Sequence, residues 1–317
     1  MEKKIIVTNK CNNKCVFCDL KKKEPTEEEI KNELDIAKEN GAKKIVFTGG
    51  EPTIRKDIID FVKYAKELGF LEIWMETNGR MFAYRDFTKK IVEAGLTRVI
   101  INFPASEQKI FENITGVKKS FLQTVMGLKN LSKEDIFISI STVITKLNYR
   151  DLYNIVLFLH ANFVGINQFS FSFLHPCKNY EKLVVNFKEL GPHLEKMLKF
   201  CKNTNIDVSV EGVPLCFMNG YEHYSFDARR SLFDMRLTEI NPFNDKEEMK
   251  NLENKKIKLK KCRICSLNEL CPGVWKKYNR LFNIQLQPSE KDKEPIKSKM
   301  TSYYQRLDKL IKKYRGL

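Results

Sequence analysis

The chain has 317 residues, nine cysteines and a formal net charge of +16. This length allows one large core with a small appendage. No apolar run is long enough to span a membrane and the first residues do not form a signal peptide, so we expect a cytoplasmic protein whose cysteines bind metals or do redox work rather than form disulfides. The charge permits RNA as a partner without arguing for it, because lysines are spread over the whole chain.

Three cysteines follow the first predicted strand with the spacing Cys-x3-Cys-x2-Cys: Cys11, Cys15 and Cys18. Three thiolates can hold three irons of a cubane cluster and leave the fourth iron open to a small molecule, whereas structural clusters usually have four cysteine ligands. Zinc is the alternative, but zinc prefers four closed ligands, and the nearest further candidate, Asp19, directly abuts Cys18. The motif therefore favours a cluster with one open iron.

This cysteine loop resembles that of the radical S-adenosylmethionine (SAM) family. The resemblance implies a [4Fe-4S] cluster whose open iron chelates the amino and carboxylate groups of SAM. It also assigns Phe17, which lies inside the loop, to SAM binding.

A helix is predicted over residues 25–40, with Thr26 as its N-cap, three glutamates in its first turn and Gly41 at its end. A short apolar strand from Lys44 then runs into a glycine turn. Glycines at the end of a strand let the backbone approach a ligand closely. In the radical SAM family a Gly-Gly-Glu-Pro at this place contacts the SAM amino group. The resemblance gives that role to Gly49, Gly50 and Glu51.

Strands and helices continue to alternate after this turn. Further strands are predicted over 71–77, 98–103, 136–145 and 166–175. Helices are predicted between them over 58–68, 87–94, 121–131 and 152–161. Such alternation implies a parallel sheet with right-handed crossovers. We therefore predict an α/β fold, and six such units fit the partial (β/α)6 TIM-like barrel of this family.

Polar residues stand at the ends of several of these strands, where parallel α/β folds have their active sites. Thr77 and Asn78 match a pattern that touches SAM in relatives. Asn102 occupies the place where relatives often carry a serine near the ribose, although this chain has Asn-Phe-Pro there. Ser139 and Ser141 alternate on the fifth strand, so both are candidates for the barrel interior, or small polar fillers of a strand.

Four more cysteines lie further along the chain: Cys216, Cys262, Cys265 and Cys271. Four thiolates are enough to close a cubane, and zinc is again the alternative. The run Cys-x2-Cys-x5-Cys with a remote partner resembles the SPASM and twitch extensions of radical SAM enzymes. The full SPASM pattern has a further cysteine where this chain has Trp275, so we expect one auxiliary [4Fe-4S] cluster.

Two cysteines remain. Cys201 lies in a helical run, and its side chain is expected to pack in the buried core. Cys177 follows the sixth strand at the mouth of the barrel, where a thiol could return a hydrogen atom to a substrate radical, as in epimerases of this family. The alternative is an inert loop thiol. His175 and Glu211 are candidate proton carriers, with solvated strand-end residues as the alternative.

We predict a radical SAM barrel at 1–205, an auxiliary cluster domain at 206–285 and a basic connector with a terminal helix at 286–317. The segment 283–299 is polar and contains two prolines, which predicts an irregular connector that wraps around the domain. The helix is expected over 301–314. Its apolar face would comprise Tyr304, Leu307, Leu310 and Ile311.

The resemblance implies an enzyme that cleaves SAM reductively and takes hydrogen from an unactivated carbon, with a flavodoxin or ferredoxin as electron donor. A peptide or protein is the leading substrate, because many SPASM and twitch relatives act on peptides. A nucleotide, an RNA, a sugar or a small alcohol are the alternatives. The alternative class is an RNA-binding protein that holds zinc or clusters and has no SAM chemistry.

Overall fold

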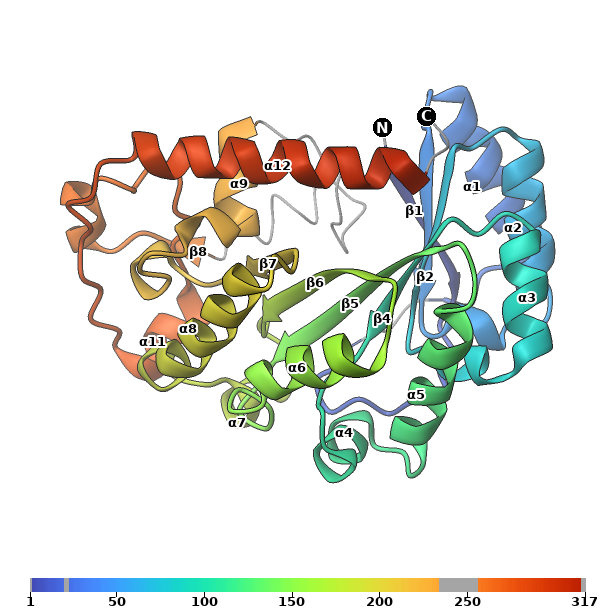
Figure 1. Ribbon diagram of the computed structural model, residues 1–317, viewed down its shortest axis with the longest axis horizontal. Helices are drawn as coiled ribbons and strands as arrows, with labels where there is room; N and C mark the ends of the chain where they lie inside the picture. The colour runs from blue at the N-terminus through green and yellow to red at the C-terminus, as the bar shows by residue number, and fades with distance from the viewer. Residues whose placement is uncertain (1, 20–22, 234–255, 315–317) are drawn as a thin grey trace.

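The computed structural model describes residues 2–19, 23–233 and 256–314. Its centre is a parallel sheet of seven strands in sequence order (Figure 1). The strands are β1 (Glu2–Thr8), β2 (Lys44–Gly49), β3 (Glu72–Thr77), β4 (Arg98–Asn102), β5 (Phe137–Ile144), β6 (Ile166–Phe173) and β7 (Val208–Glu211). The predicted α/β partial barrel is confirmed.

Helices connect and cover these strands. Those of the barrel are α1 (Glu27–Glu39), α2 (Ile58–Glu67), α3 (Arg85–Glu93), α4 (Gln108–Thr115), α5 (Ser120–Leu131), α6 (Leu152–Asn162), α7 (Tyr180–Leu183) and α8 (Phe187–Asn203). The predicted start of α1 is confirmed by a reciprocal capping box between Thr26 and Glu29. Gly41 follows the helix with a positive φ of 75°.

The alternation of side chains along each strand separates two faces. On β6 the aromatic residues Phe169, Phe171 and Phe173 are buried in the main core, whereas the serines between them are partly exposed. A small separate cluster of Val46, Trp74 and Ile100 fills part of the inner face. The main core therefore lies between the sheet and its helices, and the inner face carries most of the polar side chains.

Three elements of the barrel were not predicted: β7, α4 and α7. β7 has only four residues and too little pattern to be recognised, yet it pairs with β6 from Phe169 to Ser172. It lies just beyond the boundary predicted at residue 205. The helix α4 was not predicted, because its eight residues contain few apolar positions.

The remaining elements follow β7. They are α9 (Phe226–Phe233), β8 (Lys256–Ile257), β9 (Val274–Trp275), α11 (Lys276–Phe282) and α12 (Glu294–Tyr314). β8 and β9 form a small antiparallel pair. Part of the predicted cluster domain, residues 234–255, lies outside the described residues.

The terminal helix α12 begins earlier than predicted, because Pro295 is tolerated in a first turn. The connector prediction is therefore wrong for residues 294–299. Figure 1 shows α12 crossing the molecule from the side of α9 to that of β1. Tyr303 Oη donates to Val208 O (2.8 Å), which fixes α12 to β7.

The predicted apolar face of α12 is only partly right. Leu307 is buried, Leu310 packs partly buried against the core, and Tyr304 stacks on Phe233 with ring centroids 5.1 Å apart. The Ile311 side chain lies outside the described residues. The buried face contains three further apolar residues, Ile296, Met300 and Tyr303. No helix in the described part of the chain is long and apolar enough to cross a membrane.

Candidate functional site

The first cysteine loop lies between β1 and α1 and is fixed by neighbours on both sides. Lys14 N donates to Thr115 O (2.8 Å) and Val16 N donates to Ile114 O (3.0 Å), both at the end of α4. Within the loop, Cys18 N donates to Cys15 O (3.0 Å). The loop that carries the three thiols therefore depends on a helix about a hundred residues away in sequence.

The end of β3 holds the other side of this loop. Asn78 Nδ2 donates to Asn12 Oδ1 (2.6 Å), and its distance to Cys11 Sγ is 4.0 Å. Arg80 donates to Asn12 O and to Asn13 Oδ1 (2.8 Å). Asn78 thus lies beside the cysteines, as predicted from its place at a strand end. Arg80 was missed, since nothing in its sequence context marks a loop-binding role.

The glycine turn after β2 lies directly on the chain that leads to Cys11. Gly50 N donates to Thr8 O (2.7 Å) and Glu51 N donates to Lys10 O (2.8 Å). A Cβ atom at Gly50 would lie 2.0 Å from Lys10 O, and one at Gly49 would lie 2.2 Å from Thr8 O. Both glycines are therefore required by close backbone packing against the cysteine loop.

The Glu51 carboxylate is buried and surrounded by donors of the protein. It accepts hydrogen bonds from Thr53, from Thr77 Oγ1 (2.7 Å) and from Asn78 N (2.6 Å). Burial raises the pKa of this carboxyl, and the hydrogen bonds oppose that rise. The side chain of Glu51 thereby ties the end of β2 to the end of β3.

The three thiols of the first loop interact electrostatically. Burial, followed by the charges of Cys11 and Cys18, raises the pKa of the Cys15 thiol to about 12. Burial also raises the pKa of Cys11, whose sulfur accepts a hydrogen bond from Asn13 N (3.3 Å). Three thiolates on one loop repel one another and need a cationic centre, and this donor set fits an iron–sulfur cluster.

Polar side chains line the inner face of β4–β7 beyond this loop. The strand register places Asn102, Ser141, Ser170 and Ser209 in one row. Asn102 Oδ1 is buried and has no hydrogen-bond partner, which leaves an acceptor for a ligand. Ser170 belongs to this row but was not predicted, although the Phe-Ser alternation of β6 marks its face.

Other predicted residues lie around this row. Ser139 lies two residues before Ser141 on β5 and is buried. It accepts a hydrogen bond from Arg98 (2.6 Å), so it belongs to a structural network. Phe17 packs partly buried against the main core. Cys201 is fully buried in α8, as predicted.

The loop after β6 contacts the first cysteine loop. Lys178 N donates to Asp19 Oδ2 (2.7 Å) and Asn179 Nδ2 donates to Val16 O (2.8 Å). These bonds bring Cys177 to the same mouth of the barrel. Its side chain is partly buried, and burial raises the pKa of the thiol, so the protonated form dominates near neutral pH.

Charged and aromatic side chains gather at the ends of β6 and β7. Glu211 Oε2 accepts from Ser172 Oγ (3.0 Å), whereas Lys256 Nζ is paired with Asp227 Oδ1 (2.8 Å). The His175 ring lies 5.0 Å from that of Trp275. Burial lowers the pKa of His175, so its neutral form is favoured.

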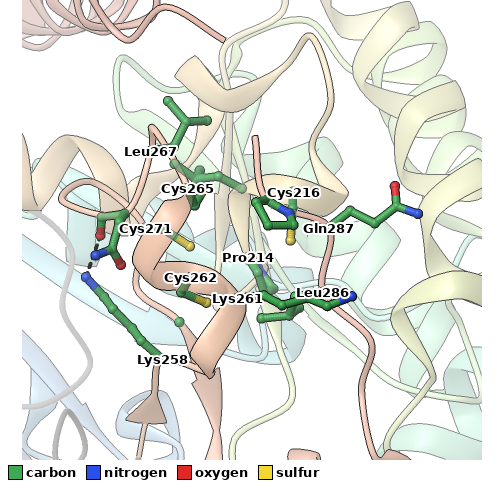
Figure 2. A pocket seen from close by; sticks show the side chains of 14 residues that line it. Pro214, Cys216, Lys258, Lys261, Cys262, Cys265, Leu267, Cys271, Leu286 and Gln287 are labelled. Atoms are coloured by element: carbon green, nitrogen blue, oxygen red, sulfur yellow. Dashed lines mark hydrogen bonds between the residues drawn. The ribbon is translucent and has the colours of Figure 1, made fainter. Parts of the chain in front are cut away.

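The four later cysteines line one pocket, which Figure 2 shows: Cys216, Cys262, Cys265 and Cys271. Burial, with the charges of the other three thiols, raises the pKa of Cys216 to about 12. Leu286, Gln287 and Pro288 also line the pocket, so residues on both sides of the predicted boundary at 285 contribute to it. That contribution was missed because it depends on the fold of a connector.

Backbone amides point at the sulfurs of this pocket. Ser289 N donates to Cys265 Sγ (3.3 Å), Gln287 N–H lowers the pKa of Cys216, and the N–H groups of Gly273 and Leu215 lower that of Cys271. Such bonds stabilise thiolate ligands of iron–sulfur clusters. Among the described residues, no three His, Cys, Asp or Glu side chains converge on a point for a single metal ion. A cubane offers a separate iron to each thiolate, so its ligands need not converge.

Residues 5–159, which include the cysteine loop, match the sequence profile of the Radical SAM superfamily. Residues 5–159 therefore belong to the radical SAM superfamily. Membership implies SAM and a [4Fe-4S] cluster as cofactors. The barrel and the three-cysteine loop that the sequence predicts are therefore those of a radical SAM domain.

Curated relatives match a little under two thirds of this chain. The probable GTP 3′,8-cyclase of Saccharolobus islandicus strain M.14.25 is 29% identical over 203 residues, which cover 61% of this chain and 64% of that protein. The probable GTP 3′,8-cyclase of Sulfurisphaera tokodaii is 29% identical over 202 residues, with 62% and 63% covered. The chain thus spans a little under two thirds of the length of these relatives.

Solved structures extend the likeness of fold beyond the barrel. Streptococcus suis SuiB bound to S-adenosylmethionine superposes with a TM-score of 0.62 at 19% identity. The matched residues make up 92% of this chain and 76% of the SuiB chain. The enzyme anSMEcpe with bound AdoMet and Kp18Cys peptide has a TM-score of 0.63 at 12% identity, with 99% and 100% covered. At these identities the likeness concerns the fold alone.

Proposed function

We propose that this radical SAM protein uses Cys11, Cys15 and Cys18 to hold the cluster that binds SAM. When bound, cluster and SAM supply one chemistry, the reductive cleavage of SAM to methionine and a 5′-deoxyadenosyl radical, which takes hydrogen from a substrate carbon. The observation that carries the proposal is the three-thiol loop held against the ends of β2 and β3.

The chain's own residues would orient SAM in this site. The backbone of Gly49, Gly50 and Glu51 is the proposed contact for the amino group, supported by the close packing of this turn on the cysteine loop. The Glu51 side chain is a positioning group, since it accepts from Thr77 and Asn78.

The remaining SAM contacts are proposed on the inner face and the loop. The unpartnered Oδ1 of Asn102 would accept from a hydroxyl or amino group of the ligand, with Ser141 beside it in the register. Phe17 and Asn78 would flank the bound SAM from the cysteine loop and β3.

We propose that Cys216, Cys262, Cys265 and Cys271 hold an auxiliary [4Fe-4S] cluster in a twitch-like or SPASM-like extension. Support comes from the shared pocket and from the N–H groups directed at three of the sulfurs. Four thiolates leave no open iron, so this site would move an electron and not bind substrate. Such a relay favours an oxidative outcome, such as dehydrogenation or cross-linking of the substrate.

A peptide or protein is the proposed substrate. Two cations of the inner face, Lys4 and Lys44, are paired with carboxylates, and so is Lys256 at the mouth of the barrel. In contrast, no cation of the described chain lies within ion-pair distance of Glu211. A free carboxylate beside serine hydroxyls suits amide and ammonium donors and opposes a polyphosphate. SuiB, whose fold this chain shares, has been solved bound to its precursor peptide SuiA.

A nucleotide is the second candidate substrate. The observation in its favour is that both curated relatives described above are probable GTP 3′,8-cyclases. Their likeness covers a little under two thirds of either protein at 29% identity, so the nucleotide remains the second candidate. An RNA, a small alcohol and a sugar rank below it.

Cys177 is proposed as the hydrogen-atom donor in the alternative to an oxidative outcome, a redox-neutral epimerisation. Its loop is bonded to the first cysteine loop, and its thiol is protonated near neutral pH. With a turned-over substrate in deuterium oxide, the parent protein would introduce deuterium into the product and Cys177→Ala would not. Deuterium in the product of Cys177→Ala would remove this role.

The experiment that tests the function is anaerobic reconstitution with iron and sulfide, followed by dithionite and SAM. Chromatography should detect 5′-deoxyadenosine. Addition of candidate peptides or of GTP then separates the substrates, since the true substrate should raise the deoxyadenosine yield and itself lose hydrogen. Iron-replete protein that makes no deoxyadenosine would contradict the proposal and leave the rival class, a metal-bearing RNA-binding protein. A cytoplasmic location and a flavodoxin or ferredoxin as donor belong to the same proposal.

A further inference from the structure

One exposed face of the chain is formed by the short 3-10 helix η5 (Lys260–Ile264) and the residue two before it. We call it the η5 face. Its members are Lys258, Lys260, Lys261, Arg263 and Ile264. All five side chains are exposed, and Ile264 is 79% exposed. Ile264 is among the most exposed large apolar side chains of the described residues, and here it stands among four cations.

The η5 face covers the four-cysteine pocket. Cys262 lies within η5 and Cys265 directly follows it. Lys258 and Lys261 line the pocket itself, and Figure 2 shows both beside Cys262. A charge on this face is therefore adjacent to the site where the auxiliary cluster is proposed.

The composition of the face indicates the kind of partner. An apolar centre with a charged rim is the usual anatomy of a small transient interface, and redox encounters are among the smallest of these. Four cations attract an acidic partner and speed its approach. The phosphates of an RNA would pair with the cations, but neither Ile264 nor a cluster next to the face would contribute to RNA binding.

We propose that the η5 face docks a small acidic one-electron carrier protein, which exchanges one electron with the auxiliary cluster. The inference rests on the proposed function, because it requires the second cluster. In each encounter one electron leaves the reduced centre and the oxidised centre takes it up, with no bond made or broken. The face thus gives the auxiliary site its own route for electrons, separate from the mouth of the barrel.

The test uses the full chain with Cys15→Ala, so that the auxiliary cluster is the one iron centre to be reduced. Stopped-flow mixing with photoreduced flavodoxin, an acidic carrier, follows the bleaching of the cluster, and dithionite serves as a small reductant that needs no docking. The reversal Lys260→Glu with Arg263→Glu, at two residues of the η5 face outside the pocket lining, is compared with Lys63→Glu and Lys89→Glu, two exposed lysines on α2 and α3.

At low salt, the η5 reversal should slow reduction by flavodoxin about tenfold or more, within the range that electrostatic steering gives. The Lys63 and Lys89 reversal should leave the rate within about twofold, and dithionite should reduce all three proteins alike. In the Cys15→Ala parent, added salt should slow flavodoxin steeply and dithionite little. This measurement needs no further variant, so a rate that salt does not change would overturn the proposal even where the reversed protein fails to fold.

A flavodoxin rate that is unchanged by the η5 reversal, or unchanged by salt, in protein with an intact auxiliary cluster, would overturn the docking proposal alone. Absence of a second cluster in iron-replete parent protein would instead overturn the proposed function of the pocket. Binding of a labelled RNA that is lost on η5 reversal, with the flavodoxin rate unchanged, would also overturn the docking proposal and assign the face to RNA.

Discussion

The first cysteine loop and the four-cysteine pocket differ in what surrounds their sulfurs. In the loop, Cys11 and Cys18 are exposed, and the hydrogen bonds hold the backbone to β3, α4 and the turn after β2. In the pocket all four cysteines are partly buried, and amides from three separate segments point at their sulfurs. On the proposed function, the loop would leave one side of its cluster open to SAM, whereas the pocket would enclose its cluster. The number of thiols that the fold brings together would then set the different roles of the two clusters.

The largest effect should come from removing one thiol at each site. Cys15→Ala should lower the iron content from about eight to about four per chain and abolish deoxyadenosine formation. Cys265→Ala should lower iron by the same amount but keep the cleavage of SAM in the absence of substrate. Iron analysis and chromatography check both. Loss of deoxyadenosine in both variants at full residual iron would show that the two sites do not have separate roles.

Gly50→Ala should disturb the first site and spare the second. The new Cβ would meet Lys10 O at 2.0 Å, so the chain leading to Cys11 must move. We expect deoxyadenosine formation to fall about tenfold or more, while the iron of the pocket is retained. Gly191→Ala is the matched control, because a Cβ there meets nothing within 4 Å. Equal rates for the two variants would contradict the packing account.

Asn102→Ala probes the open side of the first site. Its Oδ1 is a buried acceptor without a partner, so removing a bond that it makes to SAM should raise the KM for SAM about threefold to tenfold, with kcat little changed. Asn162→Ala at the exposed end of α6 is the control. A KM for SAM that stays at the parent value would place SAM away from β4.

The smallest predicted effect is the contribution of His223 to the pH dependence of the free energy of unfolding. Burial, followed by the charge of Lys299, lowers the pKa of His223 to about 4, and Lys202 and Arg229 also lower it while Glu222 opposes them. The folded pKa is below the unfolded value of about 6.5, so the unfolded chain binds more protons between these values. This part of the stability is complete above pH 6.5 or so and is lost as the pH falls toward 4.

Denaturant unfolding between pH 7.5 and 5 should therefore show falling stability, and His223→Gln should flatten the slope. His160→Gln, at an exposed position of α6, should leave it unchanged. A slope that persists in full in His223→Gln would assign the acid sensitivity to other groups.

Sequence patterns predicted the features that depend on local chemistry. The capping residue Thr26, the alternation of strands and helices, and both cysteine spacings could be read from neighbouring residues. The pattern could not identify β7, because four residues carry too little periodicity, nor the segment 286–289, whose place over the pocket depends on where α12 packs. Arg80 and the end of α4 were missed for a similar reason. Both hold the cysteine loop through contacts between residues far apart in the chain.

The most direct test of the central claim, an open iron at the three-thiol loop, is electron paramagnetic resonance of the reduced Cys265→Ala protein. This variant should retain the first cluster as its intact cubane. Addition of SAM should change the g values of that signal, because SAM would become a ligand of the fourth iron. A spectrum that is identical with and without saturating SAM would contradict the account.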